Sequence, residues 1–305
     1  MSKMKLYALM LTVMMLWGFN VIAIKVIVEV FDPAAITAFR IFVAGLTVMA
    51  LVIIWREIRW LTKKEGYYVF VATITGVVAH HFFLAIGVAN TTASNAGLIA
   101  GLVPLLTTLF AAMFLGDRLT VSKSSGILFG LVGVAFIILN GSGSISSISK
   151  GDLFVFLSIT AQAISFIFIK KGTETMSPRL MTGWMLLFGS GGLLITSLLL
   201  NPSGIQTFSL GSPFVWVVFV SSAVFATALG HSMYNYTIQH LGPGETAIFI
   251  NMTPFFALLG SYLFLGETIT PVQIFGFLLI IIGVLLGTGA VKPSLFKINR
   301  HKRAY

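Results

Sequence analysis

Long apolar stretches follow one another along almost the whole chain, and short polar segments separate them. A helix needs about 20 apolar residues to cross the roughly 30 Å hydrocarbon core of a bilayer. Ten stretches reach this length, and they lack the alternation that is typical of membrane-barrel strands. Their approximate limits are 6–28, 33–55, 67–89, 93–115, 122–140, 152–171, 178–200, 213–239, 245–265 and 271–289. The pattern predicts an all-α membrane protein with ten transmembrane helices.

The two halves of the chain repeat each other. At an offset of 150 residues, Pro104 aligns with Pro254 and His81 aligns with His231. Because each half contains five spans, an odd number, the second half enters the membrane inverted relative to the first. Inverted repeats of this kind are a recurrent transporter design, with the substrate site at mid-depth between the repeats. We therefore expect a first repeat at 1–140 and a second at 152–289 around a central cavity, followed by a basic cytoplasmic tail at 290–305.

The composition agrees with a location in lipid. Of the 305 residues, 57% are hydrophobic and 9% are charged, whereas soluble domains contain about 25% charged residues. Nearly all of the 19 Lys and Arg residues lie in loops on one predicted side of the membrane or in the tail, and the opposite side has only Lys150. Because positively charged loops stay in the cytoplasm, we expect a multi-pass protein of the cell membrane with both termini cytoplasmic.

The charge and the cysteine count exclude several other classes. No segment combines basic and aromatic residues as a nucleic-acid groove does, so the net charge of +10 does not indicate binding to nucleic acid. The basic tail is instead expected to contact anionic membrane lipid. The chain has no cysteine, which excludes disulfides, thiolate metal sites and cysteine nucleophiles. We expect no metal and no cofactor.

Several short motifs connect the chain to a known family. Residues 16–20 (LWGFN), residues 38–40 (AFR) and the turns 115–120 (LGDRLT) and 265–270 (LGETIT) resemble signatures of the EamA family in the drug/metabolite transporter superfamily. The resemblance covers both halves. It implies a ten-helix inner-membrane carrier with a central cavity, often an exporter of amino acids, metabolites or drugs. Asp117 departs mildly from the pattern, since the first turn of the family more often has Glu.

Polar residues inside the spans indicate which helices face a cavity, because a polar group in lipid costs free energy unless it faces protein or water. On the eighth span a polar stripe lies along one face of the helix, and the sixth span carries a shorter one around Gln162. The first span offers Trp17 and Asn20. We expect the first, third, fourth, sixth, eighth and ninth spans to line the cavity, and the fifth and tenth to lie outside it. The stripe on the eighth span consists of Thr227, His231, Tyr234, Asn235 and Gln239.

The histidines His81 and His231 both fall near the middle of their spans. An imidazole can bind a substrate carboxylate or take up protons near neutral pH, but a hydrogen bond between helices would serve equally well to keep it there. His80 points to a different face from His81, and the sequence does not decide which of the two faces the cavity.

Two further residues open helices at corresponding positions of the repeats. Asn95 begins the fourth span and Glu245 begins the ninth, so we expect them to act as gates at opposite ends of the cavity. The alternative for Glu245 is a favourable interaction with the helix dipole. Trp17 lies too deep for an interfacial belt and is expected to form an aromatic wall, with plain packing as the alternative. The predicted substrate-binding residues are Trp17, Asn20, His81, Asn95, Gln162, His231, Tyr234, Asn235 and Glu245.

Arg40 and the two repeated prolines are the remaining unusual groups inside spans. Arg40 lies about 10 Å within the second span, and we interpret it as part of a structural ion pair or carbonyl clamp. Pro104 and Pro254 each free a carbonyl four residues earlier, at Ala100 and Ile250. These breaks favour substrate binding or bending during alternating access, with a static kink as the alternative.

The sequence therefore predicts a secondary transporter that exports small metabolites, such as amino acids or drug-like compounds, by alternating access. A channel or a non-transporting scaffold is the alternative. An enzyme is not expected, because the spans contain no HExxH or GxSxG motif and no pair of Asp residues. No acid lies in the central third of a span, which argues against coupling through a buried carboxylate. A polar change at Ile280, on the tenth span, is expected to leave transport intact. The substrate and a homodimeric state are left open.

Overall fold

The structure is a computed structural model that describes residues 3–115, 120–140, 149–241, 246, 249–250 and 252–287. The described residues are mainly helical and contain no strand. Seven helices are long and apolar enough to cross a membrane, and three shorter apolar helices lie at 124–133, 253–265 and 271–283. The predicted class, an all-α membrane protein, is confirmed. The total of ten spans and the inverted arrangement of the repeats stay predictions.

The first half of the chain contains α1 (Lys3–Val28), α2 (Pro33–Ile54), α3 (Lys63–Thr73), the π-helix η1 (Ile74–Ala79), α4 (His80–Ala89), α5 (Ala93–Ala100), α6 (Val103–Leu115) and α7 (Val121–Asn140). The second half contains α8 (Lys150–Gly172), α9 (Pro178–Leu200), the 3₁₀-helix η2 (Gly204–Leu210), α10 (Pro213–Ser221), the π-helix η3 (Ser222–Leu229), α11 (Gly230–Leu241), α13 (Thr253–Leu265) and α14 (Pro271–Gly287). Each predicted apolar stretch thus corresponds to a helix or to a broken run of helices.

The sequence marks where several helices begin. Asp32 accepts a 2.8 Å hydrogen bond from the backbone N–H of Ala35 at the start of α2. Ser177 and Ser212 cap α9 and α10 in the same way. In all three helices a proline follows the capping residue, where its fixed φ suits the first turn and its missing N–H needs no partner. The helix starts are therefore set locally.

The third and eighth predicted spans both contain a π-helix near their middle. η1 ends immediately before His80, and η3 ends immediately before Gly230, 150 residues later. In η3 the hydroxyl of Thr227 donates a 3.0 Å hydrogen bond to the carbonyl of Ser222, five residues earlier. Single π-helical turns inside α-helices occur mostly at functional sites. The repeat therefore extends to a local distortion that periodicity does not reveal.

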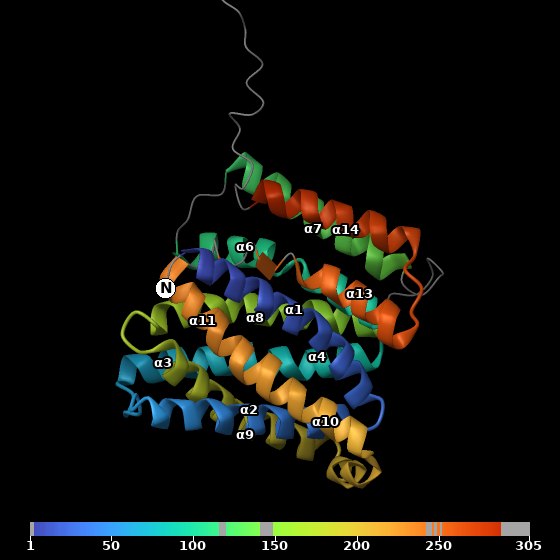
Figure 1. Cartoon of the computed structure of the whole chain (residues 1–305). Coiled ribbons are helices and arrows are strands. Elements are labelled where there is room, and N and C mark those ends of the chain that lie inside the picture. The colour runs from blue at the N-terminus through green and yellow to red at the C-terminus, as the bar shows by residue number, and fades with distance from the viewer. Residues whose placement is uncertain are drawn as a thin grey trace, which may run out of the picture.

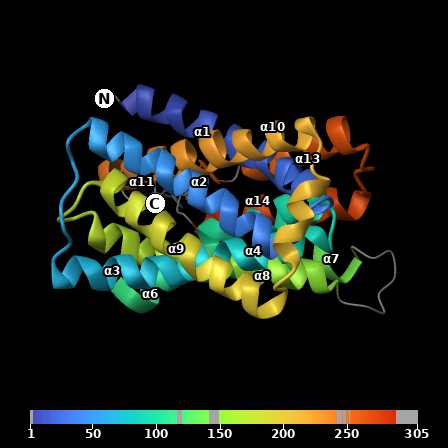
Figure 2. The same ribbon diagram turned by 90° about the horizontal axis from the view of Figure 1, so that it is seen from below.

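The helices pack in layers, as Figure 1 shows. α7 lies against α14 along one edge of the molecule, and α2 lies against α9 along the opposite edge. Figure 2 shows the α2–α9 pair on the near side. Between these pairs α1 packs against α13, and α4 packs against α8. Large apolar side chains such as Leu199 and Phe264 are exposed, as expected for surfaces that face lipid.

Ion pairs tie the segment that follows α2 to the start of α9. The Arg179 guanidinium binds the Glu57 carboxylate, and the Ser177 hydroxyl donates a 2.7 Å hydrogen bond to the same carboxylate. The guanidinium carbon also lies 4.3 Å from the centre of the Trp55 ring. Glu57 thus joins two helices that lie side by side along one edge.

Acidification is expected to weaken this junction. The hydrogen bond from Arg179 lowers the pKa of Glu57 below its ordinary value of 4.5. A carboxylate with a depressed folded-state pKa stabilises the fold fully above the unfolded value, and the contribution is lost as the pH falls through the folded pKa. Thermal unfolding of the wild type and of Glu57→Gln in detergent should therefore differ near neutral pH and converge below pH 4.5. A constant difference down to acid pH would contradict this assignment.

Candidate functional site

A cavity of about 80 Å³ lies among the helices between the two edge pairs. Its lining comes from α1, α4, α5, α6, α8, η3, α11, α13 and Ile250. These elements belong to the first, third, fourth, sixth, eighth and ninth predicted spans, the six that the polar stripes indicated. The residues of α7 and α14 that the structure describes do not line it. Its polar and aromatic lining consists of Trp17, Asn20, His80, His81, Gln162, Thr227, His231 and Thr253.

A second cavity of about 20 Å³ shares His81, Gln162 and His231 with the first. It adds Asn235 from α11 and Thr182 from α9. A water molecule needs roughly 10–15 Å³ of such space, so together the two cavities hold a few waters. Ligand pockets normally measure about 300–1,000 Å³. In this conformation a substrate of ordinary metabolite size therefore fits only if the helices move apart.

Trp17 forms part of the wall of the larger cavity. Its ring centroid lies 5.0 Å from that of His231 and 4.9 Å from that of Tyr234. The indole N–H donates a 3.0 Å hydrogen bond to the carbonyl of Ala226 in η3. The structure therefore fixes the indole ring from two elements. Tyr234 is buried and also packs against Phe166, so it supports Trp17 and lines neither cavity.

His81 and His231 meet at the cavities, with their ring centroids 5.7 Å apart. His81 is buried, and its Nδ1 lies 3.4 Å from a terminal nitrogen of the Arg40 guanidinium. A guanidinium has only donors, so Nδ1 is the acceptor and the neutral His81 ring carries its proton on Nε2. This Nε2 has no hydrogen-bond partner among the described residues. His81 thus offers an unpaired N–H at the place where the two cavities meet.

Arg40 extends from α2 to the hydroxyls of η3. Its guanidinium donates to Thr227 Oγ1 at 2.6 Å and to Ser222 Oγ at 3.4 Å. The Ser222 hydroxyl in turn donates a 2.6 Å hydrogen bond to the Oδ1 of Asn20. Asn20, whose side-chain oxygen is occupied in this way, therefore has its amide NH₂ left for the larger cavity that it lines. The chain of hydrogen bonds runs from Arg40 toward the cavity.

His80 borders the larger cavity but is held by α8. Its Nδ1 lies 2.8 Å from Ser158 Oγ and 3.2 Å from the Ser158 carbonyl. His81, by contrast, borders both cavities and has the unpaired nitrogen. Of the two neighbouring histidines, His80 is the one whose contacts explain its burial without a ligand.

Asn235 and Gln162 complete the polar lining of the smaller cavity. The amide nitrogen of Asn235 donates a 2.8 Å hydrogen bond to Thr182 Oγ1, which links α11 to α9. The Oδ1 of Asn235 is buried without a partner in the described part of the chain. The cavities therefore present a free donor at His81 and a free acceptor at Asn235. Such groups fix the orientation of a bound solute.

A sequence model described as the EamA-like transporter family matches residues 4–139 and again residues 149–288. The chain belongs to this family. The chain is 28% identical over 298 residues to the uncharacterized transporter YyaM of Bacillus subtilis (strain 168), covering 96% of both chains. It is 26% identical over 284 residues to an uncharacterized transporter of Archaeoglobus fulgidus, covering 93% of this chain and 98% of the relative. A chloroplastic WAT1-related protein of Arabidopsis thaliana is 23% identical over 280 residues, covering 88% and 66%.

The fold is also similar to that of a solved crystal structure. The two chains are 18% identical, the TM-score is 0.70, and the match covers 96% of this chain and 99% of the other. At this identity the likeness concerns the fold alone. The resemblance to the EamA family that the motifs indicated is confirmed, and the chain is an integral membrane protein of a transporter family.

Within this EamA chain, two predicted gate residues have different outcomes. Asn95 is buried and lines neither cavity. Its amide nitrogen donates to Asp152 at 3.2 Å, and its oxygen accepts a 2.8 Å hydrogen bond from Gln273. Asn95 thus joins α5, α8 and α14, and these contacts explain its burial without a substrate. Glu245 lies outside the described residues.

The prediction for Arg40 was wrong about its partners. None of the ion pairs in the described part of the chain includes Arg40, and its hydrogen bonds go to hydroxyls and to His81 rather than to carbonyls. The nearby acid Asp32 instead caps α2 and binds Asn201. The only sequence signal for this role is a charged residue well inside a span, because Ser222 and Thr227 are more than 180 residues away.

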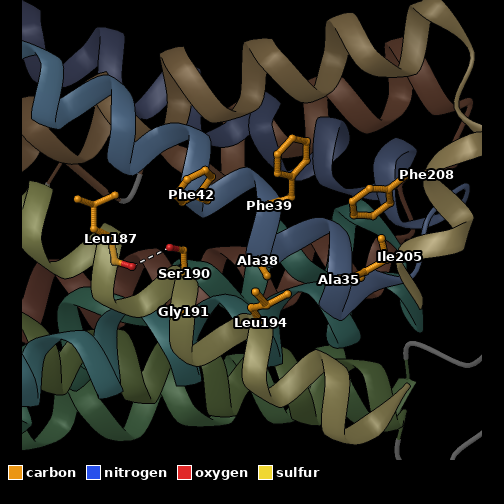
Figure 3. Close-up of a pocket in the computed structure, with 10 residues that line it drawn as sticks. All are labelled: Ala35, Ala38, Phe39, Phe42, Leu187, Ser190, Gly191, Leu194, Ile205 and Phe208. Carbon is orange, nitrogen blue, oxygen red and sulfur yellow. Dashed lines mark hydrogen bonds between the residues drawn. The ribbon is translucent and has the colours of Figure 1, made fainter. Parts of the chain in front are cut away.

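A larger pocket lies elsewhere, beside the α2–α9 pair and η2, and has a volume of about 420 Å³ (Figure 3). Phe39 and Phe42 of α2 and Phe208 of η2 contribute to its apolar wall. The only side-chain hydroxyl in its lining, that of Ser190, already donates a 2.7 Å hydrogen bond to the carbonyl of Leu187. This pocket offers no charged group to orient a solute. The smaller, polar cavities are therefore the candidate site.

Proposed function

We propose that this member of the EamA-like transporter family is a secondary transporter of the cell membrane that exports small metabolites by alternating access. The observation that carries the proposal is the pair of small polar cavities, bordered by His81 and His231 and enclosed by helices from both halves of the chain. A closed cavity of this size is what a carrier shows between its two open states. A channel needs a continuous aqueous path instead.

The inverted repeat of two five-helix halves supports this proposal. The family model matches each half separately, and the π-helices η1 and η3 occupy corresponding places 150 residues apart at their ends. The pairs α2–α9 and α7–α14 join corresponding spans of the two halves. In known inverted-repeat transporters the substrate site lies between the repeats, and one repeat rocks against the other around it.

The same arrangement gives the expected membrane orientation. Both termini are proposed to be cytoplasmic, with the basic tail at 290–305 against anionic lipid. The tail lies outside the described residues. A homodimer is not required, because residues of a single chain enclose both cavities.

Counterflow in proteoliposomes tests the proposal. Liposomes that contain the purified protein are loaded with one unlabelled metabolite at a time and diluted into the labelled form. A carrier accumulates label transiently, because each inward step exchanges for an outward one. The absence of counterflow across a broad panel of metabolites, or single-channel currents in a planar bilayer, would contradict the proposal.

A further inference from the structure

Arg40 is a buried cation in the interior of α2, with 2% of its surface exposed. A buried charge in a membrane protein is costly unless another charge or polar group compensates it, and such a residue normally belongs to a functional site. The hydroxyls of Thr227 and Ser222 and the Nδ1 of His81 satisfy some of its N–H groups. None of these groups carries a negative charge. The positive charge of Arg40 is therefore solvated but not neutralised by the described residues.

The acids that the structure describes are all engaged away from Arg40 or exposed to solvent. Asp117 and Glu245 lie outside the described residues. Glu29 pairs with Lys25, Asp32 caps α2, Glu57 binds Arg179, Glu65 binds Arg59, Asp152 binds Asn95, Glu267 accepts from the backbone N–H groups of Ala93 and Ser94, and Glu174 is exposed. Among them, no carboxylate is in place to balance the guanidinium.

The groups between Arg40 and the cavities are arranged as donors. Arg40 donates to His81, so the unpaired Nε2–H of His81 faces the cavities that this residue lines. Through Ser222, Arg40 also fixes the oxygen of Asn20 and leaves its NH₂ for the larger cavity. An N–H donor beside a cation attracts an anionic acceptor. We propose that the cavities bind the carboxylate of a small monoanionic organic acid, which provides the missing negative charge for Arg40.

A single carboxylate suits this site better than other charged groups. One negative charge balances the one guanidinium, whereas a doubly charged phosphate would leave an unpaired charge away from water. A cation would meet Arg40 with the same sign. The larger cavity, of about 80 Å³, admits only a small group in this conformation. Arg40 itself lines neither cavity, so it acts as a positioning residue through His81 and Thr227.

This inference rests on the proposed transport function for its biological meaning, but binding can be measured separately. The full-length protein in lipid nanodiscs is titrated with sodium acetate, sodium lactate and sodium pyruvate. Each acid is paired with its neutral amide at equal sodium chloride concentration, and the unfolding temperature is recorded. A ligand that binds the folded state raises this temperature. We expect at least one acid to raise it and its amide to leave it unchanged.

Variants assign the effect to the site. Arg40→Gln is expected to weaken binding of that acid about 10- to 100-fold, as for loss of a charged hydrogen-bonding group. Arg40→Lys keeps the charge and should retain part of the affinity. His81→Phe removes the N–H donor, keeps a ring, and should also weaken binding. Arg56→Gln makes the same chemical change at an exposed residue outside the helices, and should bind the acid as the wild type does.

The outcomes separate the two proposals. Equal shifts for an acid and its amide, equal shifts with sodium chloride alone, or unchanged affinity in both His81→Phe and a folded Arg40 variant would overturn the carboxylate inference. Counterflow of a neutral or cationic solute without any binding of acids would also overturn it and leave the transporter proposal intact. Binding of an acid in the wild type that Arg40→Lys retains in part and His81→Phe loses would support it, even if no labelled acid crossed the bilayer.

Discussion

Replacing His231 or Asn235 with alanine is expected to reduce transport at least tenfold, which corresponds to about 1.4 kcal/mol. His231 packs on Trp17 and borders both cavities. Asn235 has an unpaired oxygen at the smaller cavity and ties α11 to α9 through Thr182. Either change removes a polar group from the place where a solute would be oriented. Counterflow in proteoliposomes, normalised to the amount of folded protein, measures the effect.

The matched control is a truncation on the outer face of α14. Ile282 is 44% exposed, and Ile282→Ala should leave transport unchanged. Ile280, which the sequence suggested for this purpose, is unsuitable because it is fully buried against Gly101 and Gly133. A polar change there would destabilise the protein whatever its effect on transport. If Ile282→Ala and the two cavity variants lost transport equally, the assignment of the site would be wrong.

Replacing Gly283 with alanine is expected to destabilise the protein by about 1–3 kcal/mol, the usual range for an overpacked interior. A Cβ at this position would lie 2.6 Å from the carbonyl oxygen of Gly126 and 2.7 Å from the backbone nitrogen of Gly130. Both obstacles are backbone atoms, so no side chain can rotate away and α14 must separate from α7. The unfolding temperature in detergent and the monodisperse fraction on size-exclusion chromatography should both fall.

Gly191 in α9 provides the control for this substitution. A Cβ added at Gly191 meets no described atom within 4 Å. Alanine has a higher helix propensity than glycine by about 1 kcal/mol, so Gly191→Ala should leave the protein equally or more stable. Equal losses of stability from the two substitutions would show that the close approach of α7 and α14 does not contribute to the fold.

The sequence was sufficient to predict the helices and the part of them that faces the cavity. Apolar length sets the spans, and a polar stripe such as that around His231 can be buried only toward protein or water. For this reason the six lining spans could be named before the structure. The proline breaks were also predictable, since α5 ends at Ala100 and α6 begins at Val103, just before Pro104. Ala100 and Ile250, whose carbonyls these prolines free, both border the larger cavity.

Other features depend on contacts that sequence separation conceals. The π-helices η1 and η3 change the rotation of a helix without changing its composition, so hydrophobic periodicity does not detect them. Asn95 was assigned to a gate because it corresponds to Glu245 in the repeat, but its partners Asp152 and Gln273 lie on other helices. Arg40 was assigned to an ion pair because acids are near it in sequence, whereas the fold turns it toward His81. Correspondence between repeats predicts position better than it predicts chemistry.

The account depends most directly on a central cavity that opens alternately to the two sides of the membrane. The chain has no native cysteine, so a single Ala96→Cys or Ala226→Cys places one thiol in the lining of the larger cavity. The measurement is labelling by a membrane-impermeant thiol reagent in right-side-out and inside-out vesicles. We predict that each cysteine is labelled in both kinds of vesicle and that labelling blocks transport. Labelling in only one kind of vesicle, or in neither, by a protein that still transports would contradict the account.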